Sequence, residues 1–209
     1  MGQQTVHVAV YDALADWEVG FATAHIRDTS YHRPPRTGFA IATVGLTEEP
    51  VVTMGGMRIQ PDLTVDALRP QDSALLILPG ASSWDTGDAN APFARAARAF
   101  LDADVPVAAI CGATAGLARE GLLDDRDHTS GAAGYLAATG YRGGDRYREA
   151  AAVTDGNLVT AGPTEPVAFA REVLALLDVY EPEVLDAWYR LFSASDASAF
   201  GVLAEAAQR

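Results

Sequence analysis

Residues 107–116 read V-A-A-I-C-G-A-T-A-G, an apolar run that turns into a helix-forming segment at the only cysteine of the chain. The run 107–110 predicts a short buried strand, and the Ala- and Leu-rich segment 113–120 predicts a helix that begins after Gly112. Cys111 is therefore expected at a strand-to-helix hinge, where a side chain projects out of both elements. The sulfur would also lie near the positive end of the helix dipole.

A lone cysteine has two interpretations. In most proteins it is a small, inert, buried side chain. The hinge and the adjacent Gly112 favour a reactive thiol instead, because a nearby helix N-terminus stabilises the thiolate. We therefore predict that the pKa of Cys111 lies below its ordinary value and that its thiolate is a nucleophile.

The rest of the chain alternates strand and helix patterns. The run A-L-L-I-L at 74–78 is continuously apolar, which is typical of a central parallel strand, and ends in Pro79-Gly80. Further strands are predicted at 6–11 and 39–44, with turns at Gly55-Gly56 and Asp155-Gly156 that join short strand pairs. Helices are predicted at 17–26 (capped by Asp16), 91–103, 132–138, 166–177, 183–192 and 197–207. This alternation predicts an α/β fold with a doubly wound, mostly parallel sheet, in a single domain over residues 1–209.

Ligands of such sheets bind at the carboxyl ends of the strands. Three of these ends carry notable residues: Asp16-Trp17-Glu18 after the first strand, Gly80 after the run 74–78, and Cys111. The sequence therefore predicts a ligand site at this edge of the sheet.

Composition excludes several classes of function. The chain has 209 residues and a formal net charge of -13, which disfavours binding to nucleic acid and to anionic membranes. No apolar run approaches membrane-spanning length. One cysteine forms neither an internal disulfide nor a cysteine-based metal cluster, and His7, His25 and His32 lack metal-ligand spacing. We therefore expect a cytoplasmic protein without a bound metal that binds neither nucleic acid nor membranes.

Together these residues resemble the DJ-1/PfpI (ThiJ) superfamily, which is related to class I glutamine amidotransferases. The resemblance is carried by D-W-E-V-G at 16–20, L-I-L-P-G-A at 76–81 and A-I-C-G-A-T-A-G-L-A at 109–118. R-D-H-T-S at 126–130 and L-V-T-A-G at 158–162 follow in the family's order. The resemblance implies a flavodoxin-like α/β/α sandwich that forms a homodimer.

The resemblance also implies roles for individual residues. Cys111 would be the nucleophile and Glu18 the acid that hydrogen-bonds its sulfur. The backbone N–H groups of Gly80 and Gly112 would hold an oxyanion, and His128 would move a proton. The alternative for Glu18 is an ordinary first-turn helix acid, and the alternative for His128 is a loop residue with no catalytic part.

For three further side chains near these motifs we expect structural roles. Trp84 would pack in the core or wall the pocket, and packing is favoured. Asp85 and Asp88 are expected in a solvated loop.

Departures from the family pattern reduce the number of activities that we expect. Gly112 follows Cys111 where the protease-like branch has His, and no late His supplies a glutaminase triad, so neither peptidase nor glutaminase activity is expected. We predict a cofactor-independent, cysteine-dependent enzyme that acts on a small electrophile, as a hydrolase, amidase or glyoxalase/deglycase-like enzyme. The alternatives are a redox-sensing or stress-response protein, an isocyanide hydratase-like lyase, and a dimeric binding module with a vestigial pocket.

Overall fold

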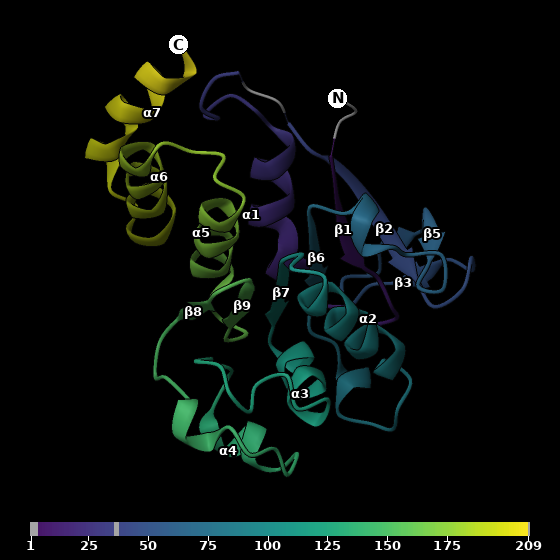
Figure 1. The fold of residues 1–209 in the computed structure, drawn as a ribbon. Coiled ribbons are helices and arrows are strands. Elements are labelled where there is room, and N and C mark those ends of the chain that lie inside the picture. The colour runs from purple at the N-terminus through teal and green to yellow at the C-terminus, as the bar shows by residue number, and fades with distance from the viewer. Residues whose placement is uncertain (1–3, 36–37, 209) are drawn as a thin grey trace.

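A seven-stranded sheet forms the centre of the computed structural model, which describes residues 4–35 and 38–208 (Figure 1). The strand order is β5-β2-β1-β6-β7-β9-β8, and all neighbours are parallel except β8 and β9. The strands are β1 (Thr5–Ala9), β2 (Ala40–Gly45), β5 (Leu63–Thr64), β6 (Leu75–Leu78), β7 (Val107–Ile110), β8 (Ala152–Asp155) and β9 (Leu158–Ala161). A separate hairpin joins β3 (Val51–Val52) to β4 (Arg58–Ile59).

Helices cover both faces of the sheet. On one face lie α2 (Ala91–Asp102) and α3 (Gly112–Arg119), and on the other lie α1 (Asp16–Arg27) and α5 (Pro166–Leu176). Helices α6 (Pro182–Ala194) and α7 (Phe200–Ala207) stack outward from α5, and the short α4 (Ala133–Ala137) lies beyond α3 (Figure 1). This is the predicted α/β sandwich with a mostly parallel sheet.

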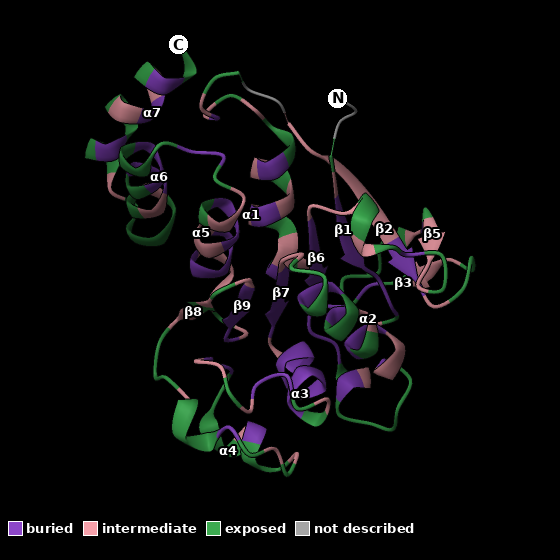
Figure 2. Ribbon diagram, viewed as in Figure 1, coloured by how far each residue is buried: buried purple, intermediate pink, exposed green. Residues whose placement is uncertain are grey.

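The central strand β6 shows why the sheet forms where it does. Leu76 and Leu78 of β6 face one core, and Leu75 and Ile77 face the other, because successive side chains of a strand point to opposite faces. All four are fully buried, and Figure 2 colours strands β6 and β7 as buried. Each such side chain stabilises the fold by about 1.5–3 kcal/mol through apolar burial. The prediction of a central strand at 74–78 is confirmed.

One local prediction is wrong, and one short strand was not predicted. Asp16 was expected to cap α1, but Ala15 occupies the N-cap position and Asp16 is the first helical residue. The Asp16 carboxylate instead accepts a hydrogen bond from the Gly55 N–H at 2.7 Å, because the tip of the β3–β4 hairpin lies within its reach. Strand β5 was not predicted, since two residues carry no periodic pattern.

No helix within the described ranges combines the length and apolar character that crossing a bilayer requires. The same ranges hold no group of three or more His, Cys, Asp or Glu side chains placed to bind a metal ion. The prediction of one domain over 1–209 stays a prediction, and its ends at 1–3 and 209 lie outside the described residues.

Candidate active site

The strand order places three chain segments side by side at one edge of the sheet. Strands β1, β6 and β7 are neighbours, and their carboxyl ends lead to Glu18, Gly80 and Cys111 respectively. The Gly80 N–H donates a hydrogen bond to Glu18 Oε2 at 2.5 Å. A Cβ atom added at Gly80 would lie 2.6 Å from Cys111 Cβ, 2.8 Å from its Sγ and 2.9 Å from Glu18 Oε2. Glu18 and Cys111 therefore pack against a position that only glycine fits.

The hinge predicted at Cys111 is present and strained. Its φ of 58° and ψ of -128° place a non-glycine residue in a region that L-amino acids rarely occupy, at a cost on the order of 1–3 kcal/mol. Hydrogen bonds on both sides hold this conformation. The Cys111 N–H donates to the Ala161 carbonyl at 3.0 Å, and the Cys111 carbonyl accepts the Thr114 N–H at 3.1 Å. The Thr114 hydroxyl also donates to that carbonyl, at 2.6 Å.

Glu18 is a buried acid with an unusual environment. Its side chain is fully buried, and its Oε1 has no nitrogen or oxygen partner within the described part of the chain. Burial raises the pKa of Glu18 to about 7, and the bonds from the Gly80 N–H and the Cys111 thiol only partly oppose this. Glu18 is therefore able to take up and release a proton near neutral pH.

The thiol differs from its predicted state. Burial first, and then the Glu18 carboxylate, raise the pKa of Cys111 to about 12, while the Gly112 N–H opposes this rise. The prediction of a lowered thiol pKa is therefore wrong for a Cys111 that faces a charged Glu18. Each negative charge disfavours the other, so the thiolate requires the proton to lie on Glu18.

The two predicted oxyanion donors are already engaged. The Gly80 N–H binds Glu18, and the Gly112 N–H interacts with the Cys111 sulfur. Gly80 therefore differs from its implied role, because it positions the acid. Of the two, only the Gly112 N–H can stabilise the negative charge first on the sulfur and then on a substrate oxygen.

A cavity of about 280 Å³ opens from Cys111 to solvent. Its apolar wall is formed by Ala15, Trp17, Met54, Ala81 and Pro163. Its polar side chains, besides Cys111, are those of Glu18, Ser82, Asp85 and Tyr135.

One polar pair of this wall was missed by sequence reasoning. The Tyr135 hydroxyl donates to Asp85 Oδ1 at 2.6 Å. Asp85 is exposed, as expected, but it also belongs to the cavity wall. Tyr135 and Met54 carried no sequence signal, because each comes from a segment distant from Cys111 in the chain.

Trp84 packs rather than lining the cavity, as favoured from the sequence. It is 3% exposed, and its Nε1–H lies 2.9 Å from the Tyr11 hydroxyl and 3.1 Å from the Pro79 carbonyl. A Cβ atom at Gly116 would overlap its ring, so this glycine lets the indole lie against α3.

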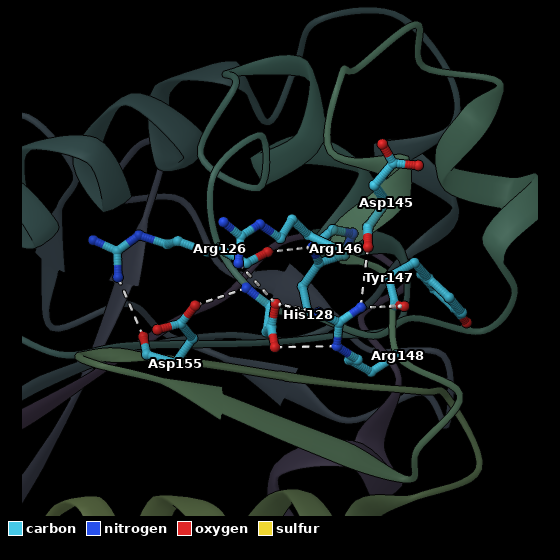
Figure 3. A network of polar contacts seen from close by, with 8 residues as sticks. Arg126, His128, Asp145, Arg146, Tyr147, Arg148 and Asp155 are labelled. Carbon is cyan, nitrogen blue, oxygen red and sulfur yellow. Dashed lines mark hydrogen bonds and ion pairs between the residues drawn. The ribbon is translucent and has the colours of Figure 1, made fainter.

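The structure places His128 in a separate polar network, drawn in Figure 3. Its Nδ1 lies 2.7 Å from the Arg126 carbonyl, and its Nε2 lies 3.0 Å from the Tyr141 hydroxyl. The ring is fully buried, burial lowers its pKa, and it does not line the cavity. The expectation that His128 moves a proton at Cys111 is therefore not supported. The cause is local, since the loop after Arg126 turns the ring toward Tyr141 and Tyr147.

Comparisons with known proteins agree with this architecture. The sequence profile of the DJ-1/PfpI family matches residues 4–176. A Bacillus subtilis protein named uncharacterized protease YoaZ is 37% identical over 193 residues, which are 91% of either chain. Deglycase PH1704 of Pyrococcus horikoshii is 28% identical over 148 residues, 70% of this chain and 88% of that protein. A crystal structure of a ThiJ/PfpI family protein from Bacillus anthracis has a TM-score of 0.92 and 36% identity, and the match covers 99% of both chains.

Proposed function

Because the chain belongs to the DJ-1/PfpI family, we propose that it is a cofactor-independent, cysteine-dependent enzyme that acts on small carbonyl compounds. One observation carries the proposal. The half-buried sulfur of Cys111 lies at a solvent-open cavity and interacts with a buried acid whose pKa is raised to about 7. A nucleophile beside a group that donates and accepts protons near neutral pH is what carbonyl addition requires.

In the first step, the pair loses one proton and the remaining proton lies on Glu18, with the negative charge on Cys111. The thiolate attacks the carbon of an aldehyde, a C–S bond forms, and the C=O π electrons move to the oxygen. Glu18 gives its proton to that oxygen, which yields a hemithioacetal. The Gly112 N–H stabilises the oxygen while its charge develops.

A 2-oxoaldehyde allows a complete turnover. The Glu18 carboxylate removes the hydrogen of the former aldehyde carbon as a proton and returns a proton to the neighbouring carbon. The hydroxyl proton on the former aldehyde oxygen moves to the oxygen of the neighbouring carbonyl, which gives a thioester of a 2-hydroxy acid. Water then cleaves the thioester and restores the thiol. One substrate carbon is oxidised and its neighbour is reduced, so the reaction needs no external oxidant or reductant.

Peptide hydrolysis is supported less well. Among the described residues that line the cavity there is no imidazole to activate water or to protonate an amine. The volume of about 280 Å³ lies near the lower end of the roughly 300–1,000 Å³ of typical small-molecule sites, which suits a small substrate.

The test uses methylglyoxal as substrate and NMR detection of lactate. We expect the wild type to form lactate and Cys111→Ala to reduce the rate at least about 1,000-fold, since the attacking atom is removed. Met57→Ala is a matched control, because Met57 is exposed and does not line the cavity. Lactate formation by Cys111→Ala, or no conversion of small aldehydes or activated esters by the wild type, would overturn the proposal.

Redox sensing is a second candidate. The Gly112 N–H and Glu18 both interact with the sulfur, and both would bind the oxygens of an oxidised cysteine. Mass spectrometry after low hydrogen peroxide tests this candidate. Selective conversion of Cys111 to its sulfinic acid in a protein without turnover would favour it over the enzyme.

A further inference from the structure

We propose that the cavity selects carbonyl substrates with an uncharged, apolar substituent, and that Trp17 and Met54 select it. This inference rests on the proposed function, because it names the substrate class of the same site. Neither residue was given a role from the sequence.

The charges around Cys111 argue against anionic substrates. Among the described residues that line the cavity, none is Arg, Lys or His, whereas Glu18 and Asp85 both carry carboxyl groups. The net charge of the chain is -13, so no cationic surplus offsets them. A carboxylate or phosphate on the substrate would enter without a partner and would be repelled.

Trp17 supplies a fixed apolar surface at the cavity. Its side chain is 50% exposed, although it comes directly before the buried Glu18 in α1. The indole Nε1–H donates to the Pro163 carbonyl at 3.1 Å, which ties two cavity-lining residues from distant parts of the chain together. The ring is therefore held in place while much of its face stays open to a ligand.

Met54 supplies the second apolar surface, from the tip of the β3–β4 hairpin. Its side chain is 54% exposed, yet its backbone is anchored, since the Met54 N–H donates to the Leu14 carbonyl at 2.9 Å. The neighbouring Gly55 N–H is bound to the Asp16 carboxylate, so the tip is fixed to the start of α1. Exposed apolar side chains gathered at one cavity mark a binding surface, and a flexible thioether and an indole that line the same cavity suit an aryl or alkyl group.

The first experiment measures this preference without turnover. Cys111 is alkylated with phenacyl bromide, iodoacetamide and iodoacetate, and each rate is divided by the rate for N-acetylcysteine. We expect phenacyl bromide to be preferred over iodoacetamide by at least about tenfold, and iodoacetate to be disfavoured by about tenfold. Trp17→Ala and Met54→Ala should each remove most of the phenacyl preference. Met57→Ala, on the same hairpin, should keep it. Equal normalised rates, or a preference that Trp17→Ala leaves unchanged, would overturn the inference.

The second experiment compares turnover of phenylglyoxal, methylglyoxal and 4-carboxyphenylglyoxal, with Cys111→Ala measured in parallel to subtract adducts on arginine. We expect kcat/KM to be at least about tenfold higher for phenylglyoxal than for methylglyoxal. We expect it to be lower for 4-carboxyphenylglyoxal than for phenylglyoxal, because the added carboxylate meets no cation in the cavity. A phenacyl preference without turnover of any aldehyde would refute the proposed function and leave the apolar site standing. Turnover that favours 4-carboxyphenylglyoxal would refute the inference alone.

Sedimentation of Trp17→Ala completes the test. A loss of self-association with an unchanged phenacyl preference would assign this surface to a second copy of the chain and would overturn the inference.

Discussion

Two loop regions of this protein hold buried ionisable groups in opposite ways. At the Cys111 site, an acid and a thiol lie side by side, Glu18 Oε1 has no nitrogen or oxygen partner within the described ranges, and the nucleophile has a strained φ. Around His128, both ring nitrogens have partners, and the flanking Asp127 is paired with Arg148. Groups whose polar atoms are all paired are held in one state, whereas an acid with one unpaired oxygen can exchange a proton. The difference is that the Cys111 region keeps an exchangeable proton, as the proposed function requires, whereas the His128 region fixes its groups in hydrogen bonds and ion pairs.

Among variants that keep both Cys111 and Glu18, the largest expected effect comes from Gly80→Ala. Its new Cβ would fall 2.6 Å from Cys111 Cβ, so the nucleophile and Glu18 must shift apart. We expect turnover to fall at least about 100-fold and the free energy of unfolding to fall by about 1–3 kcal/mol. Gly20→Ala is the control, because its Cβ meets nothing within 4 Å on the exposed side of α1. Full activity in Gly80→Ala would show that this close approach does not position the pair.

The converse is expected for His128→Ala. Removing a fully buried ring leaves a cavity and two unpaired groups, so we expect a loss of about 3 kcal/mol in the free energy of unfolding, measured by urea denaturation. Turnover per folded molecule should stay within about twofold of the wild type. Tyr141→Phe removes only the hydroxyl and should cost about 1 kcal/mol. A turnover loss that matches that of Cys111→Ala would show that His128 takes part in catalysis.

This region should also respond to pH. Because burial lowers the pKa of His128 from 6.5 in the folded state, the unfolded chain binds the proton first. Wild-type stability should therefore fall as pH drops below about 6.5, and His128→Ala should weaken that dependence.

The smallest effect is expected for Arg148→Ala. Its guanidinium bonds both Asp127 oxygens, at 2.8 and 3.0 Å, but the two side chains remain 44% and 35% exposed. Solvent screening limits such a pair to about 0.2–1 kcal/mol. A double-mutant cycle with Asp127→Ala measures the coupling. A coupling well above 1 kcal/mol would mean that this ion pair, rather than the burial of His128, holds the network together.

Much of the fold follows from local patterns. The apolar runs at β6 and β7 and the glycine-marked turns placed the sheet, and the strand ends at Glu18, Gly80 and Cys111 indicated where the three segments converge. These features depend on residues close in the chain, which is why the sequence is sufficient for them.

The chemistry of the site was harder to predict. A cysteine at a helix N-terminus indicates a lowered pKa, but burial of the thiol, and after it the charge of the Glu18 carboxylate, reverse that direction. Likewise, the H-T-S turn does not show that the His128 ring points toward Tyr141. Trp17 and Met54 line the same cavity because the β3–β4 hairpin is hydrogen-bonded to Leu14 and Asp16. Each of these outcomes depends on a tertiary contact that no local pattern encodes.

The central claim is that Glu18 holds the proton while Cys111 carries the charge. The direct measurement is the pH dependence of Cys111 alkylation by iodoacetamide in the wild type and in Glu18→Gln, with Asp88→Asn as a control that removes an acid outside the cavity. The account predicts an apparent pKa near 7, the value to which burial raises the pKa of Glu18, and a rise above 9 in Glu18→Gln, where the thiol must ionise without an acid. A lower apparent pKa in Glu18→Gln than in the wild type would contradict it, because Glu18 would then be a carboxylate that suppresses the thiolate.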